Sequence, residues 1–335
     1  MLDQHEYARL SPDLVLDAVE SLGYVCDMRV LALNSYENRV YQVGIEGSTP
    51  IIVKFYRPSR WSDEQILEEH RFSQALQDLE IPVIAPLALP IQAATTPTDN
   101  TLADYKGFRF ALYPRKGGHA PELDNLDTLL TLGQHLGQIH ACGKMLAFEA
   151  RPTLTIDSFG YQCRSYVLES GFLPSSLTES YTTLTAHLLE KIETIYALKS
   201  FADIRLHGDC HPGNILSHPE SLFIVDLDDA RNGPAIQDIW MLLSGDMEQK
   251  RAQLSSILEG YKEFCEFDYS EIRLIESLRT LRLIHYAAWL ARRWEDPAFP
   301  KAFPWFNTER YWAEHILELR EQLAELDLPS IRLQG

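Results

Sequence analysis

The sequence predicts an α+β protein with two lobes, a small N-terminal lobe rich in strands and a larger, mostly helical C-terminal lobe. Three strand-like runs lie within the first 56 residues, and helical patterns dominate from residue 125 onward. A run of strands followed by a run of helices is typical of an α+β fold. We place the boundary after residue 113, so the predicted lobes are residues 1–113 and 114–335.

Composition limits the classes of function. The chain has 335 residues, is 45% hydrophobic and can form one large or two closely packed domains. Its net charge of −18 argues against binding to nucleic acid or to an anionic membrane. Five cysteines without a CxxC spacing favour reduced thiols. The sequence has no apolar signal core and no membrane-length apolar run, so we expect a soluble, cytoplasmic protein, and we expect a monomer.

The elements of the first lobe follow from local patterns. A helix is predicted over residues 11–22, with Ser11 as its N-cap and apolar residues at helical spacing. Strand-like runs then occupy residues 29–33, 39–45 and 50–56. This order predicts a hairpin followed by a third strand.

The remaining elements lead into the second lobe. Residues 108–114 form the last strand predicted for the first lobe. Helices are predicted at residues 125–141, 176–198, 270–293 and 308–324, where apolar residues recur at helical spacing.

The chain is organised around residues 206–238, which read LHGDCHPGNILSHPESLFIVDLDDARNGPAIQD. Asn214 comes five residues after Asp209, and Asp226 comes seventeen residues after Asp209, at the end of a short apolar run. In a kinase active site with this spacing, the first carboxylate accepts a hydroxyl proton, and the amide and second carboxylate hold Mg²⁺ against the phosphates of ATP. Solvated acidic hairpin loops are the alternative. The carboxylates at residues 228–229 either assist metal binding or lie in a solvated turn.

The residue types suit that chemistry. Mg²⁺ takes few oxygen ligands from protein and the rest from phosphate and water, a need that Asn214 and Asp226 meet. Asp209 must be near the metal but free of it to reach a hydroxyl. The turn at residues 212–213 can bring Asn214 back beside Asp226. Asp238 opens a predicted helix, and we expect it to brace the loop by accepting backbone N–H groups.

Lys54 lies inside the apolar run of the third strand. Because a buried Lys needs a partner, a phosphate or a helix carboxylate should pair with it. The alternative is an edge-strand Lys that discourages aggregation. The carboxylate should come from the helix predicted over residues 62–79, where Glu69 falls on the apolar stripe and Glu68 lies at its border. A solvated helix face explains either Glu as well.

The loop of residues 34–38 joins the first two strands and should lie over the phosphates of a bound nucleotide. The hydroxyl of Ser35 and the backbone N–H groups of this loop are suited to hold phosphate oxygens. Taken alone, an ordinary hairpin loop explains the segment equally well.

These motifs resemble the phosphotransferase family of aminoglycoside, choline and homoserine kinases, which shares the protein-kinase-like fold. Within it, the chain is similar to bacterial stress-response serine/threonine protein kinases. The resemblance runs from about residue 8 to residue 312, through LNSYENRVYQV, VKFYRPSRW, ILEEH, RLHGDCHPGNIL, VDLDDARNGPAIQDIWMLL and RRWEDPAFPKAFPW. It implies that Asp209 is the proton acceptor, that Asn214 and Asp226 bind Mg²⁺ with Asp226 also an active-site residue, and that Ser35 contacts ATP. It also implies a protein acceptor and a protective role under stress.

Three functions are compatible with these residues. The first is an ATP- and Mg²⁺-dependent serine/threonine protein kinase, with other proteins or the chain itself as acceptor. The second is a small-molecule kinase for an amino alcohol, a sugar or an antibiotic. The third is a pseudokinase scaffold, which the presence of Lys54, Asp209, Asn214 and Asp226 argues against. The chain lacks the GxGxxG, DFG and APE motifs of conventional protein kinases, so we do not expect activation by phosphorylation of an activation loop.

Overall fold

The computed structural model describes residues 6–90, 95, 99–198, 201–218 and 221–333. The chain divides into two compact units. Unit 1 comprises residues 1–122, 148–151 and 209–230, and unit 2 comprises residues 123–147, 152–208 and 231–335. The functional boundary that the sequence predicts after residue 113 stays a prediction.

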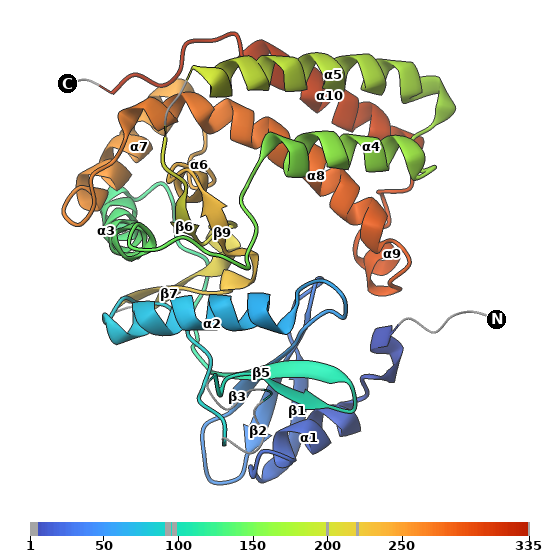
Figure 1. Ribbon diagram of the computed structural model, residues 1–335, viewed down its shortest axis with the longest axis vertical. Coiled ribbons are helices and arrows are strands. Elements are labelled where there is room, and N and C mark those ends of the chain that lie inside the picture. The colour runs from blue at the N-terminus through green and yellow to red at the C-terminus, as the bar shows by residue number, and fades with distance from the viewer. Residues whose placement is uncertain (1–5, 91–94, 96–98, 199–200, 219–220, 334–335) are drawn as a thin grey trace. The chain divides into compact units, whose positions relative to one another are not determined.

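Unit 1 is built on a five-stranded antiparallel sheet with the strand order β1-β2-β3-β5-β4 (Figure 1). Its strands are β1 (Cys26–Ala32), β2 (Arg39–Ile45), β3 (Ile51–Phe55), β4 (Ala103–Tyr105) and β5 (Phe108–Pro114). The four strands that the sequence predicts for this lobe are confirmed. The three-residue β4 was not predicted, because it lies in a polar, turn-rich segment and pairs only with β5.

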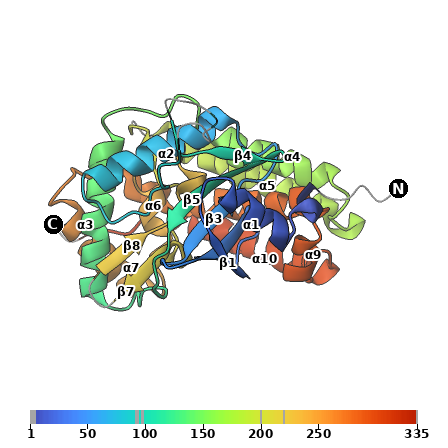
Figure 2. The same cartoon turned by 90° about the horizontal axis from the view of Figure 1, so that it is seen from below.

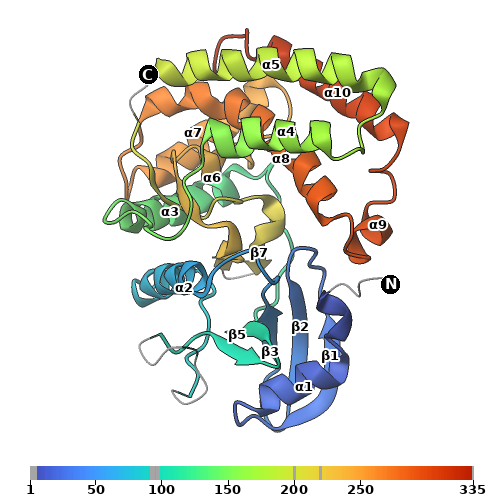
Figure 3. The same cartoon turned by 45° about the vertical axis from the view of Figure 1, so that its right-hand side comes forward.

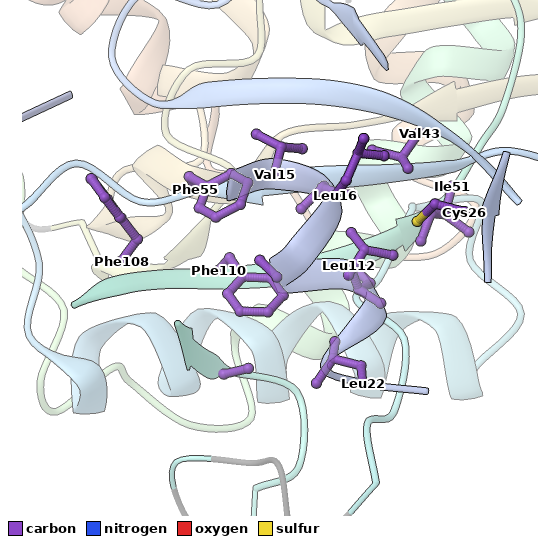
Figure 4. Close-up of a cluster of buried hydrophobic side chains, with 14 of the residues drawn as sticks. Val15, Leu16, Leu22, Cys26, Val43, Ile51, Phe55, Phe108, Phe110 and Leu112 are labelled. Carbon is purple, nitrogen blue, oxygen red and sulfur yellow. The ribbon is translucent and has the colours of Figure 1, made fainter. Parts of the chain in front are cut away.

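One face of this sheet is covered by α1 (Pro12–Glu20), which follows the 3₁₀ turn η1 (Glu6–Arg9). The predicted cap is confirmed, since Ser11 Oγ accepts a hydrogen bond from the backbone N–H of Leu14 at 3.2 Å. Figure 4 shows Val15 and Leu16 of this helix among the side chains of the strands. The rings of Phe55 and Phe110 stack there with centroids 5.3 Å apart. This cluster fixes α1 on the sheet through apolar burial.

The opposite face receives α2 (Asp63–Asp78). Ser62 and Gln65 form a capping box, with Ser62 Oγ accepting from Gln65 N at 3.2 Å and Gln65 Oε1 accepting from Ser62 N at 2.9 Å. Ile66 packs with Ala111 of β5, whose side chain lies on the face opposite to that of Phe110 because side chains alternate along a strand. The apolar stripe of α2 is therefore buried against this face of the sheet.

The segment 209–230 belongs to unit 1 and contains a hairpin of β7 (Ile215–His218) and β8 (Ser221–Ile224), which lie side by side in Figure 2. A 3₁₀ turn, η4 (Pro212–Asn214), precedes the hairpin, and a second, η5 (Leu227–Asp229), follows it. The backbone N–H of Ile224 donates to the carbonyl oxygen of Pro82 at 2.9 Å, which anchors the hairpin.

Unit 2 is mostly helical. Its strands β6 (Ile204–Leu206) and β9 (Arg231–Gly233) form a two-stranded antiparallel sheet. Helices α5 and α10 run alongside each other in Figure 3. The helices are α3 (Leu126–Gly143), α4 (Gln162–Glu169) after a π-helical turn (Asp157–Tyr161), α5 (Ser175–Ala197), α6 (Gln237–Trp240), α7 (Met247–Tyr261), α8 (Ile275–Arg293), α9 (Ala298–Ala302) and α10 (Glu309–Glu325).

The predicted helix over residues 270–293 needs a correction. Its first turn is the 3₁₀ helix η6 (Tyr269–Leu274), and the α-helix begins only at Ile275. The helices predicted at 125–141, 176–198 and 308–324 are confirmed, and the α+β class is confirmed with them.

Glycines allow close packing of α3 against α7. A Cβ atom at Gly133 would collide with the carbonyl oxygen of Ile257, and one at Gly137 would collide with that of Tyr261. Larger residues there would force the helices apart. None of the helices in the described ranges combines the length and the apolar character needed to span a bilayer.

Candidate active site

The loop from Asp209 to Asn214 is closed by a hydrogen bond from the Asn214 side chain to the backbone of Asp209. Asn214 Nδ2 donates to the backbone carbonyl oxygen of Asp209 at 3.0 Å. The turn is closed by the backbone N–H of Asn214, which donates to the carbonyl oxygen of His211 at 2.9 Å. Because Nδ2 is engaged with the loop, Oδ1 is the atom of the Asn214 amide that is suited to a metal ion.

Asp238 holds the two residues that precede this loop, all within unit 2. Its carboxylate accepts hydrogen bonds from the backbone N–H groups of His207 and Gly208, both at 2.8 Å. Burial by itself would raise the pKa of Asp238, but the hydrogen bond with His140 and the backbone donors leave the pKa lowered. The prediction that Asp238 accepts backbone N–H groups of this segment is confirmed.

One residue, Val225, separates Asp226 from the end of the hairpin. The backbone N–H of Val225 donates to the carbonyl oxygen of Asn214 at 2.9 Å, so the backbone of Asn214 lies opposite the residue that precedes Asp226. That the two side chains share a metal ion stays a prediction. Asp226 has a φ of 61° and a ψ of 64°, a left-handed conformation that costs a non-glycine residue about 1–2 kcal/mol. Strained backbone of this kind is enriched at functional sites.

Lys54 is buried in a central strand. Its side chain pairs with Asp226 Oδ1 at 2.7 Å and with Asp228 Oδ1 at 3.1 Å. Burial alone would lower the pKa of Lys54, but the two carboxylates outweigh it, and the pKa lies well above its usual value. The alternative of an edge-strand Lys is wrong, because β3 lies between β2 and β5.

Within the described residues, neither predicted glutamate forms an ion pair with Lys54. Glu68 is engaged elsewhere, since its carboxylate accepts the backbone N–H groups of Glu149, Ala150 and Arg151 at 2.6, 3.0 and 2.7 Å. Glu69 is buried, and burial raises its pKa to about 7 although the charge of Lys54 acts in the opposite direction. Lys54 thus influences Glu69 through the electric field, while its direct partners are Asp226 and Asp228.

The carboxylates after Asp226 do not form a solvated turn. Asp228 is 5% exposed, and its Oδ2 accepts a short hydrogen bond from Arg60 Nη1. Asp229 Oδ1 accepts from Arg60 Nη2 at 2.8 Å. Sequence reasoning missed Arg60, and the only signal was a basic residue close to the end of a strand that carries a Lys. Asp228 therefore forms ion pairs with two cations of unit 1, Lys54 and Arg60.

Side chains and backbone hold the loop of residues 34–38 in place. Ser35 Oγ donates to the carbonyl oxygen of Asn38 at 3.0 Å. Asn38 Oδ1 in turn accepts the backbone N–H of Arg57 at 3.0 Å. The hydroxyl of Ser35 thus shapes its own loop, and its oxygen keeps the lone pairs to accept a further hydrogen bond.

The face of the sheet that carries Lys54 also carries apolar side chains, of which Ala111 is buried and Val40 and Ile52 are half-buried. Val40 and Ala111 lie directly opposite Lys54 on the neighbouring strands, and Ile52 lies opposite Tyr113. Residues that pair directly across an antiparallel sheet share one face. An apolar face that leads to a buried ammonium group suits a flat ring joined to phosphates.

The prediction that Asn214 and Asp226 hold Mg²⁺ stays a prediction. The described part of the chain has no group of three or more His, Cys, Asp or Glu side chains that could hold a metal ion by themselves. An amide oxygen from Asn214 and a carboxylate from Asp226 instead match a hard cation that takes its other ligands from phosphate and water.

Comparison with known proteins decides the family. Residues 29–275 match the phosphotransferase enzyme family. The chain belongs to that family. It is 45% identical over 327 residues to stress response kinase A of Escherichia coli (strain K12), covering 98% of this chain and 97% of that protein. It is 44% identical over the same length to "Serine/threonine protein kinase RdoA" of Salmonella typhimurium (strain LT2), with the same coverage.

Solved structures share the fold of this chain. A structure of amicoumacin kinase hAmiN with AMP-PNP, Ca²⁺ and Ami aligns with a TM-score of 0.74 at 18% identity, covering 96% of each chain. A microcompartment-associated aminopropanol kinase aligns with a TM-score of 0.68 at 18% identity, covering 96% of this chain and 100% of the other. The predicted protein-kinase-like fold is confirmed, and this chain is a phosphotransferase.

Proposed function

We propose that this phosphotransferase is an ATP- and Mg²⁺-dependent serine/threonine protein kinase of the stress response. The observation that carries the proposal is the pairing of Lys54 with Asp226 at 2.7 Å, next to a hairpin that joins Asp226 to Asn214. The names of the two relatives, which are 45% and 44% identical, support both the stress response and the protein acceptor. The proposal gives residues 1–113 to nucleotide binding and 114–335 to catalysis and the acceptor.

The residues divide the work of phosphoryl transfer. Asp209 accepts the proton of the acceptor hydroxyl while the oxygen of that hydroxyl bonds to the γ-phosphorus of ATP. The bond between the γ-phosphorus and the bridging oxygen of the β-phosphate breaks, which releases ADP. Asn214 and Asp226 would hold Mg²⁺, which supplies charge neutralisation at the phosphates. Ser35 and the backbone of its loop orient phosphate oxygens.

Lys54 is positioned to exchange partners when nucleotide binds. In the structure its ammonium group neutralises Asp226, whose side chain is 53% exposed, and the buried Asp228. Phosphate oxygens offer the same charge as a carboxylate, so Lys54 can contact a phosphate while keeping Asp228 as its second partner. Glu69 is buried on α2, and its negative charge acts to raise the pKa of Lys54.

The proposal includes the setting of the enzyme. We assign it to the cytoplasm and to a monomeric state, with other proteins or a second copy of the chain as acceptors. The net charge of −18 favours acceptors whose Ser or Thr lies in a basic segment.

The test uses purified protein, Mg²⁺ and γ-labelled ATP, with a basic protein as acceptor and Asp209→Ala as the paired variant. Label on the acceptor or on the enzyme that disappears in the variant supports the proposal. ADP release that responds only to small hydroxylated amines or sugars would instead make the protein a small-molecule kinase. Nucleotide binding without transfer to any acceptor would identify a pseudokinase.

A further inference from the structure

Arg60 connects two segments of unit 1 that are far apart in the sequence. Its guanidinium group donates to Asp228 and, through Nη2, to Asp229 at 2.8 Å. On its other side, Nε lies 3.6 Å from Glu37 Oε1. The Arg60 side chain is 13% exposed, so these contacts are largely shielded from water.

Glu37 belongs to the loop of residues 34–38, the loop proposed to hold phosphate. Its carboxylate also pairs with Arg57 Nε at 3.0 Å. Arg57 fixes the backbone of the same loop, because it donates to the carbonyl oxygens of Glu37 at 2.8 Å and Tyr36 at 3.1 Å. The conformation of the loop is therefore tied to the position of the Glu37 side chain, and through it to Arg60.

Asp228 and Asp229 follow Asp226 closely in the chain. Asp228 is held from three sides, by Arg60, by Lys54 at 3.1 Å and by Arg151, which donates to its backbone carbonyl oxygen. The guanidinium carbons of Arg60 and Arg151 lie 5.1 and 4.2 Å from the centre of the Trp61 ring. This packing keeps both cations in place beside the segment that bears Asp226.

The chemistry of this junction requires an arginine. Burial opposes the charge of Arg60, but Asp229 and Asp228 raise its pKa, so the group stays cationic. A guanidinium group offers five donors in a rigid plane and can serve three carboxylates in different directions. A lysine at position 60 would present one flexible point charge and could not hold all three.

We propose that Arg60 is a positioning residue that fixes the loop of residues 34–38 relative to the segment of Asp226. On the proposed function, which this inference presupposes, that loop orients the phosphates and Asp226 holds the metal. A constant spacing between the two places the γ-phosphate in line for transfer. Arg60 itself contacts neither the nucleotide nor the acceptor.

The first experiment compares Arg60→Lys with Arg109→Lys. Arg109 is a suitable control, because it also bonds a carboxylate in unit 1, with Nη1 2.8 Å from Asp63 Oδ1. Its Nη1 also donates to the backbone carbonyl oxygen of Trp61 at 2.7 Å, but among the described residues it forms no ion pair with Glu37, Asp228 or Asp229. Arg60→Lys should lower kcat by about 10²-fold, the scale expected when reacting groups shift by about 1 Å. The KM for the protein acceptor should not change, and Arg109→Lys should keep wild-type kinetics. Wild-type kcat in a folded Arg60→Lys would overturn the inference.

The second experiment separates positioning from folding. Glu37→Gln leaves Arg60 paired with Asp228 and Asp229, so the fold is retained, but it breaks the link to the loop. Glu37→Gln also weakens the pair with Arg57. The double variant with Arg60→Gln should therefore lose no more activity than the more impaired of the two single variants, since both substitutions break the connection between Arg60 and Glu37. Multiplicative losses would show that the two residues act separately and would refute the link. Methylguanidine should restore part of the activity of Arg60→Ala, which a general loss of stability would not allow.

A binding measurement distinguishes failure of this inference from failure of the proposed function. Mg²⁺ should strengthen AMP-PNP binding to the wild type and to Arg109→Lys, and this strengthening should be at least tenfold smaller in Arg60→Gln. If the wild type shows no phosphoryl transfer, the proposed function fails, while the Mg²⁺ effect on AMP-PNP binding still tests Arg60. An equal Mg²⁺ effect in wild type and Arg60→Gln would reject the positioning role.

Discussion

Glu69→Gln tests the electrostatics around Lys54 through the pH dependence of stability. Glu69 is 4% exposed, and burial raises its pKa from 4.5 to about 7. Because the folded state holds this proton more tightly than the unfolded chain, the stabilisation is fully present below pH 4.5 and is lost as the pH rises through 7. At about 1.4 kcal/mol per pKa unit, the change from 4.5 to about 7 corresponds to about 3 kcal/mol.

The assay is urea unfolding of the nucleotide-free wild type and variant at pH 5 and pH 8. Because glutamine cannot ionise, the free energy of unfolding of Glu69→Gln relative to that of the wild type should rise by about 2.5 kcal/mol from pH 5 to pH 8. Any constant effect of the amide cancels in this comparison. Glu64→Gln serves as the control, because it removes the same charge from an exposed position of α2, and it should follow the wild-type pH profile. Parallel profiles for wild type and Glu69→Gln would refute the reasoning.

Three further predictions concern the proposed chemistry. Asp209→Asn should lower the rate of phosphoryl transfer by about 10²–10⁴-fold while nucleotide still binds, and unchanged turnover would remove Asp209 from the mechanism. Asp226→Ala should abolish Mg²⁺-dependent transfer, a result that full activity at millimolar Mg²⁺ would contradict. Lys54→Met should weaken ATP binding and also lower the free energy of unfolding, because the variant leaves the buried Asp228 without one of its cations. Titration calorimetry of ATP binding and scanning calorimetry of unfolding measure the two effects, and two unchanged values would exclude the role of Lys54 in holding both phosphate and Asp228.

Local signals were sufficient for most elements of the fold. The N-cap at Ser11 helped to predict α1, the apolar stripe predicted α2, and strand-like runs predicted β2 and β5. These patterns succeed because a cap or a strand depends on residues that are close in the sequence. The short β4 escaped prediction because its pairing with β5, and not its composition, makes it a strand.

The sequence by itself determined the family and the spacing of Asp209, Asn214 and Asp226. One turn and one hairpin link the backbones of these positions, and both are encoded within a single stretch of chain. Only the tertiary structure decided the partners of Lys54. Its ammonium group pairs with Asp226, which is 172 residues away in sequence, whereas the sequence pattern indicated a phosphate, Glu69 or Glu68 as the partner.

The same holds for Arg60, which bonds Asp229 across 169 residues. The physical reason is that such an ion pair forms only where the folded chain buries side chains from distant parts of the sequence next to one another. Periodicity and capping contain no information about that place, because they describe neighbours along the chain. Burial acts to raise the pKa of both Asp228 and Glu69, but the direct ion pairs with Lys54 and Arg60 outweigh it at Asp228. At Glu69, which has no such pair with Lys54 among the described residues, burial prevails and the pKa is raised.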